Sequence, residues 1–237
     1  MYGWRGKIGI IIPSLNNTME PELNKMVPRG IAVYATRLLL EKGLPDDLEK
    51  MAADTEQATD LLKTADVNGI LYGCTSGSLI KGVGWDQEII RRIEERTGIP
   101  TTTTSTAVIE AFKELGIKSV AVATPYVDAV NKIEKDFFES HGVTVVTIQG
   151  LGYTTGEELH RESPETAYAF AKQMNREEAD CLFISCTDFA TIEVLNLLEQ
   201  DTGKPAMSSN TASLWSILKK MGIKDRLDDY GEILRHL

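Results

Sequence analysis

GILYGCTSG at residues 69–77 is a short apolar run that stops at a cysteine, and CLFISCTD at residues 181–188 repeats the arrangement. The two cysteines at the ends of the runs, Cys74 and Cys186, lie 112 residues apart. Runs that are short, rich in apolar residues and without a polar–apolar alternation are typical of parallel strands buried on both faces. The repeat therefore predicts two related halves built on parallel strands.

Other matches follow the same order in both halves. Pro13 and Pro125 close the runs IGIIIP and VAVATP and are again 112 residues apart. TGIP at residues 97–100 recurs as TGKP at residues 202–205, and a hydroxyl-rich segment follows each copy. Ligands of parallel α/β sheets bind beyond the carboxyl ends of the strands, and domain interfaces are favoured binding sites. We therefore expect the active site in a cleft between the halves.

Apolar runs alternate with amphipathic stretches along the whole chain, which predicts an α/β fold with two similar, doubly wound parallel-sheet halves related by a pseudo-twofold axis. The expected strands are residues 7–12, 31–36, 69–73, 101–103, 119–124, 144–150, 181–185 and 206–208. The expected helices are residues 21–26, 48–63, 85–96, 106–115, 128–140, 164–175, 189–200 and 212–221. We assign residues 1–117 and 209–237 to the first half, with the C-terminal helix packing back, and residues 118–208 to the second.

Composition narrows the class of protein. A net charge of −10 with acidic and basic residues intermixed argues against a nucleic-acid partner, which requires a basic patch. No run of 18 apolar residues occurs, so no transmembrane helix and no membrane partner are expected. The N-terminus leads directly into the first apolar run without a signal-peptide pattern, which predicts a cytoplasmic protein.

Motifs for metals and cofactors do not occur in the sequence. The three cysteines show no zinc-type spacing, and the three histidines are scattered. There is no G-x-G-x-x-G, no phosphate-binding loop and no G-x-S-x-G elbow. We therefore expect no metal and no cofactor. His160 follows a polar loop, and we expect it to be solvated rather than to contact the site.

With metal, cofactor and serine-hydrolase motifs absent, the cysteines are the remaining candidates for catalytic residues. Cys74 and Cys186 each stand where a strand ends, and backbone N–H groups at such a point favour a thiolate. A lone cysteine beside a strand is commonly a small core residue, but its repetition as Cys-Thr in both halves favours a catalytic role. We expect at least one of the two cysteines to be a thiolate at neutral pH, with Cys74 favoured over Cys186. Cys181 lies inside a run and is expected in the core.

Polar residues follow the first strand of each half as well. PSLNNT at residues 13–18 and TPY at residues 124–126 place hydroxyl and amide groups at carboxyl strand ends, facing the expected cleft. Taken one at a time, these segments are also typical of turns and helix caps.

Six segments give the chain a resemblance to a known family. They are residues 13–20 (PSLNNTME), 73–77 (GCTSG), 103–107 (TTSTA), 123–126 (ATPY), 185–187 (SCT) and 208–215 (SSNTASLW). The chain resembles the aspartate/glutamate racemase superfamily, in the branch of maleate cis-trans isomerases, arylmalonate decarboxylases and ectoine-utilisation racemase-like proteins. The resemblance covers nearly the whole chain.

The resemblance implies an isomerase without cofactor that acts on a small unsaturated dicarboxylate. Decarboxylases of the branch keep only the second cysteine, whereas both are present here. By resemblance, Cys74 adds to the alkene carbon of maleate as nucleophile, and Cys186 handles the proton as acid/base. The implied substrate-binding residues are Ser14, Asn16, Thr75, Ser76, Tyr126, Thr187 and Ser209. The resemblance also implies a homo-oligomer, a dimer or larger.

One loop departs from the pattern of the branch. Isomerases carry an Asp-Asn pair where this chain has Thr155-Gly156. Alternatives therefore stay open: a two-cysteine racemase of aspartate or glutamate type, in which each thiol works on one face of the α-carbon, and then a decarboxylase of arylmalonate type. A binding module on an inactive scaffold is disfavoured, because dicarboxylate binding requires donors rather than two thiols.

Overall fold

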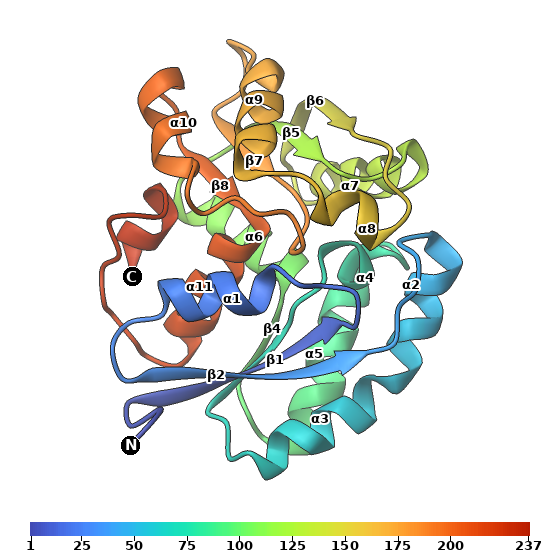
Figure 1. Ribbon diagram of the computed structural model, residues 1–237, viewed down its shortest axis with the longest axis vertical. Coiled ribbons are helices and arrows are strands. Elements are labelled where there is room, and N and C mark those ends of the chain that lie inside the picture. Colours follow the sequence, from blue (N-terminus) through green and yellow to red (C-terminus); the bar gives the residue numbers. More distant parts are fainter.

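The computed structural model describes residues 1–237 and contains two four-stranded parallel sheets (Figure 1). The strands of the first sheet are β1 (Gly6–Pro13), β2 (Ile31–Leu38), β3 (Gly69–Tyr72) and β4 (Thr101–Thr103), in the order β2-β1-β3-β4. Those of the second are β5 (Ser119–Thr124), β6 (Thr144–Gly150), β7 (Cys181–Ile184) and β8 (Ala206–Ser208), in the order β6-β5-β7-β8. The same order in both sheets confirms the predicted α/β fold with two similar halves.

Helices lie between the strands along the chain, as predicted. They are α1 (Met19–Met26), α2 (Pro45–Met51), α3 (Thr55–Thr64), α4 (Thr75–Leu79), α5 (Trp85–Thr97), α6 (Thr104–Glu114), α7 (Asp128–Ser140), α8 (Gly156–His160), α9 (Pro164–Met174), α10 (Leu195–Thr202) and α11 (Ser209–Lys220), with short 3₁₀ helices at Ala52–Asp54 and Glu232–His236. None of the helices has the length and apolar character that crossing a membrane requires.

Two expected helices differ from the prediction. Residues 48–63 form two helices, α2 and α3, separated by a 3₁₀ turn at Ala52–Asp54. The helix expected from residue 189 begins only at Leu195. The backbone N–H groups of Thr191 and Ile192 donate to the carboxylate of Glu22, at 2.7 and 3.2 Å, so that α1 binds this segment instead.

One hydrophobic core joins the two halves. Phe112 on α6 makes edge-to-face contacts with Phe138 on α7 and Phe183 on β7, each with 5.6 Å between ring centroids. In Figure 1 the first sheet lies below and the second above, with α6 and α11 between them. Helix α11 packs against α6, β3 and β4 and also against β8. We propose to count residues 209–237 with the first half, as the sequence suggested.

The carboxyl ends of the strands of the two halves meet at the middle of the molecule. The hydroxyl of Thr187, after β7, donates to the backbone oxygen of Gly73, after β3, at 3.2 Å. The side-chain amide of Asn16, after β1, donates to the same hydroxyl at 2.9 Å. The turns that follow β1, β3 and β7 are therefore fixed to one another across the boundary between the halves.

Candidate active site

A cavity opens where these turns meet, and residues from both halves line it. The empty space within its walls is about 580 Å³, the open mouth included. Both cysteines of the repeat, Cys74 and Cys186, face this one cavity. Cys181 is buried in the core on β7, as predicted.

Cys74 lies in a tight turn between β3 and α4. Its sulfur accepts a hydrogen bond from the backbone N–H of Gly77 at 3.3 Å and lies 3.8 Å from the hydroxyl of Ser76. A Cβ atom at position 77 would lie 2.9 Å from the sulfur, so only glycine allows this approach. Burial nevertheless raises the pKa of Cys74 to about 11, because the two donors offset it only in part. The predicted thiolate at Cys74 is therefore wrong for the protein without ligand, whose Cys74 is a thiol.

Cys186 has a strained backbone. Its φ of +100° lies in a region that non-glycine residues rarely adopt, and such strain is concentrated at functional sites. Its N–H donates to the hydroxyl of Ser209 at 3.1 Å, and its sulfur accepts from the N–H of Asp188 at 3.4 Å. Burial, followed by the charge of Asp188, raises the pKa of Cys186. Cys186 is therefore also a thiol.

Backbone donors remain free beside both cysteines. The N–H groups of Thr75, Ser76 and Thr187 make no hydrogen bond within the protein, and all three residues line the cavity. The amide nitrogen of Asn16 has one N–H left, because only the other is used by Thr187. The site thus offers neutral donors from both halves to an anion, at the positions where the two sulfurs lie.

Most of the predicted substrate-binding residues line this cavity. They are Asn16, Thr75, Ser76, Tyr126 and Thr187.

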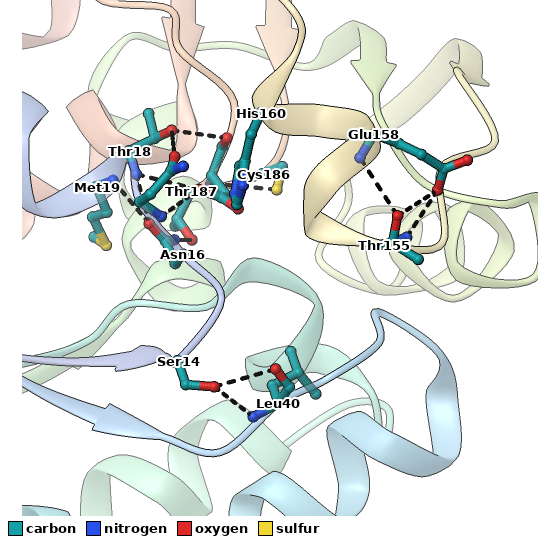
Figure 2. A network of polar contacts seen from close by, with 12 residues as sticks. Ser14, Asn16, Thr18, Met19, Leu40, Thr155, Glu158, His160, Cys186 and Thr187 are labelled. Atoms are coloured by element: carbon teal, nitrogen blue, oxygen red, sulfur yellow. Dashed lines mark hydrogen bonds and ion pairs between the residues drawn. The ribbon is translucent and has the colours of Figure 1, made fainter.

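Two predicted residues do not line it, and their assignment is corrected to a supporting position. The hydroxyl of Ser14 donates to the backbone oxygen of Leu40 at 3.2 Å and accepts from its N–H at 3.0 Å, away from Cys186 (Figure 2). Ser209 accepts from the hydroxyl of Thr75 at 2.9 Å and from the N–H of Cys186. It therefore ties the two cysteine turns together from outside the cavity.

The Thr155-Gly156 loop forms part of the rim. Thr155 caps α8 in a capping box, because its hydroxyl accepts from the N–H of Glu158 while Glu158 accepts from the N–H of Thr155 (Figure 2). Thr155 and Gly156 both line the cavity. The departure from the family pattern thus lies at the site itself.

Sequence reasoning missed an apolar wall and one acid. Leucines at positions 15, 40, 48 and 159 and Tyr153 line the cavity, and nothing in their sequence context separates them from core leucines. Asp188 follows Cys186 by two residues and also lines the cavity. Its neighbour His160 ends α8, has 26% of its side chain exposed and lies 2.9 Å from the Asp188 carboxylate. His160 itself is exposed and does not line the cavity, as expected, but its imidazole contacts Asp188, which does.

No three His, Cys, Asp or Glu side chains are grouped so as to hold a metal ion. The chemistry of the site rests on thiols, hydroxyl groups, amides and one carboxylate.

Two parallel α/β halves with a cysteine at matching strand ends, both facing one cavity, are the arrangement predicted for an enzyme of the racemase-like class. Comparison with known sequences makes this specific: the chain belongs to the arylmalonate decarboxylase family, whose profile matches residues 8–234. The predicted family resemblance is confirmed.

Among the relatives, the maleate isomerase of Alcaligenes faecalis is 25% identical over 96% of both chains. A variant of the maleate isomerase Iso from Pseudomonas putida S16, solved with maleate, superposes with a TM-score of 0.94, at 22% identity over 98% of both chains. A mutant of the Nocardia farcinica maleate cis-trans isomerase carries a covalently bound succinylcysteine intermediate; its TM-score is 0.92, at 23% identity over 97% of this chain and 98% of that one. The names of these relatives agree with the prediction of an isomerase.

Proposed function

We propose that the chain is a cofactor-independent cis–trans isomerase of a small unsaturated dicarboxylate of maleate type, with Cys74 as nucleophile and Cys186 as acid/base. The observation that carries this proposal is the position of the two thiols. One comes from each half, both face one cavity, and backbone N–H groups without partners lie beside each of them.

The donors suit an anionic substrate with two carboxylates. The N–H groups of Thr75 and Ser76 come from the first half and that of Thr187 from the second, so donors from both halves are available to the two carboxylates. Preorganised donors also stabilise the negative charge that moves onto a carboxylate when a nucleophile adds to the neighbouring alkene. Partial enclosure of the cavity strengthens these interactions by excluding water.

The two thiols together balance the reaction. The sulfur of Cys74 forms a bond to one alkene carbon as the π bond breaks, and the electron pair passes to the other carbon and its carboxylate. Cys186 gives its proton to that carbon, and the proton released by Cys74 replaces it. The former double bond is now single and rotates. In the reverse sequence, Cys186 returns the replacement proton to the Cys74 sulfur as the C–S bond breaks, and it takes back the same proton from carbon, which gives the trans alkene with both thiols restored.

A resting thiol at Cys74 is consistent with this scheme, because the net first step adds S–H across the double bond. The succinylcysteine reported for the Nocardia relative is an adduct of this kind. The wild-type chain here has both cysteines that such a cycle requires.

Proton NMR of the purified protein with single substrates tests the proposal. We expect the signal of maleate to be replaced by that of fumarate without any added cofactor, and Cys74→Ala to abolish the change. A two-cysteine racemase is the second candidate, because one thiol from each half also suits proton transfer at both faces of one carbon. In D₂O a racemase would exchange the α-proton of aspartate or glutamate and leave maleate unchanged. Loss of a carboxyl group from an arylmalonate would point to a decarboxylase.

A further inference from the structure

Asp188 is the only charged side chain that lines the cavity, and no lysine or arginine lines it. The carboxylate is buried, with 4% of its side chain exposed. A buried acid in a site for an anion costs binding energy unless it serves another purpose. The proposed binding of a dicarboxylate does not use it.

The carboxylate is held by donors from two other segments. One oxygen accepts from the backbone N–H groups of Asn17 and Thr18, at 2.8 and 3.2 Å. The other oxygen lies 2.9 Å from Nε2 of His160 at the end of α8. Asp188 is thereby fixed between the loop after β1 and the helix at the rim of the cavity, which leaves its carboxylate little freedom to bind a substrate ammonium group.

Gly156 leaves room for His160. A Cβ atom at position 156 would lie 3.1 Å from Cε1 and 3.4 Å from Nε2 of His160. A larger side chain there would push the imidazole away from Asp188. Gly156, where the loop differs from the family pattern, and His160, four residues later, therefore act together in holding Asp188.

Asp188 is directly coupled to Cys186. Its backbone N–H donates to the Cys186 sulfur at 3.4 Å, and the carboxylate anchors the same turn, in which Cys186 holds its strained φ. We propose that Asp188 and His160 are a positioning pair for Cys186: the carboxylate, oriented by His160, keeps Cys186 protonated and fixes its turn, so that Cys186 is the proton donor of the site. This inference deepens the proposed function, and the role of Cys186 as proton donor rests on that function.

The surroundings of the two thiols support this division. At Cys186 the charge of Asp188 is the largest cause after burial that raises the pKa, whereas at Cys74 it is the smallest of the causes. Burial raises the pKa of Asp188, and the hydrogen bond from His160 opposes that rise, which favours the ionised carboxylate. The other titratable groups that face this cluster are Cys74 after β3, Tyr126 after β5 and Glu134 on α7.

Alkylation of the three cysteines by iodoacetamide, followed peptide by peptide with mass spectrometry across pH, tests the pair. Asp188→Asn removes the charge, so Cys186 should react about tenfold faster at a given pH, the effect of lowering its pKa by about one unit. Cys74 should keep its rate to within about twofold, since its ionisation depends mainly on burial. His160→Ala should shift Cys186 in the same direction, and His160→Gln, which retains a donor, should restore the wild-type rate.

Labelling of Cys181 shows whether a variant has partly unfolded, because Cys181 is buried in the core of the folded protein. If Asp188→Asn exposes Cys181, the comparison of His160→Ala with His160→Gln decides instead. Unchanged labelling of Cys186 in folded variants, or equal acceleration of Cys74 and Cys186, would overturn the proposal. The assay needs no substrate, so its result is independent of whether the protein isomerises maleate.

Discussion

Cys74 and Cys186 occupy matching positions in the two halves, but individual neighbouring residues give their sulfurs different surroundings. Each sulfur has a backbone N–H and a hydroxyl beside it, of Ser76 at Cys74 and of Tyr126 at Cys186, but only Cys186 has the Asp188 carboxylate as a major opposing charge. Donors favour a thiolate and a negative charge opposes one. The environment therefore assigns Cys74 the more easily ionised thiol, although burial keeps both protonated.

This difference predicts a pH dependence of the reaction. Because burial raises the pKa of Cys74 to about 11, the fraction of thiolate in the free enzyme increases with pH throughout the neutral and mildly alkaline range. We expect kcat/KM to rise by up to about tenfold per pH unit over that range, since kcat/KM reports the free enzyme. Steady-state rates with maleate in a constant-ionic-strength buffer series measure this. A kcat/KM that falls between neutral and mildly alkaline pH would refute the assignment.

The residues of the site could be predicted where the sequence alone fixes their position. Cys74 and Cys186 directly follow apolar runs, and the carboxyl ends of parallel strands meet at one edge, so their convergence follows from the pattern. Asp188 and His160 could not be predicted as a pair, because their contact depends on how α8 packs over the turn after β7. The leucines that line the cavity could not be predicted either, because their sequence context is the same as that of leucines in the core.

How well a helix or strand could be predicted from the sequence depended on its length and its burial. All eight strands lie at the expected places, because short apolar runs between polar segments identify buried parallel strands. Helix α8, with five residues, is too short to show a helical period and read as a polar loop. The late start of α10 could not be foreseen, because the acceptor that competes for its N–H groups, Glu22, lies on α1.

Helix α8 should depend on its cap. Thr155→Ala removes the hydroxyl that accepts from the N–H of Glu158 and should cost about 1 kcal/mol of local stability. Hydrogen exchange of the amides of residues 156–160 should accelerate in this variant, and Thr155→Ser should stay close to wild type. Exchange that is the same in Thr155→Ala as in wild type would show that packing, not the cap, holds the helix over the cavity.

Contacts between the two halves hold the whole molecule together. The core around Phe112 joins helix α6 to α7 and β7, and polar contacts such as Asn16 with Thr187 join the turns of the cavity. The cavity therefore exists only when both halves are folded and docked. The predicted homo-oligomer and cytoplasmic location stay predictions, and sedimentation velocity would measure the former.

Cooperative unfolding should follow from this shared core. Phe112→Ala should lower the free energy of unfolding by about 3–5 kcal/mol, because the ring is fully buried between the halves. The matched control, Phe170→Ala, truncates a partly buried ring beside the smaller core of the second half and should cost less. Urea unfolding followed by tryptophan fluorescence and by circular dichroism measures both. Separate transitions for the two probes in the wild-type protein would show that the halves unfold independently.

The proposed reaction depends on two cysteines, one from each half. Turnover of maleate by single alanine variants of all three cysteines tests it most directly. Cys74→Ala and Cys186→Ala should each lose at least about 10³ of kcat and remain folded, because the two thiols act as a unit. Cys181→Ala should keep most of the activity, because this thiol is buried in the core away from the cavity. Full activity in either Cys74→Ala or Cys186→Ala, or loss of activity in a folded Cys181→Ala, would contradict the account.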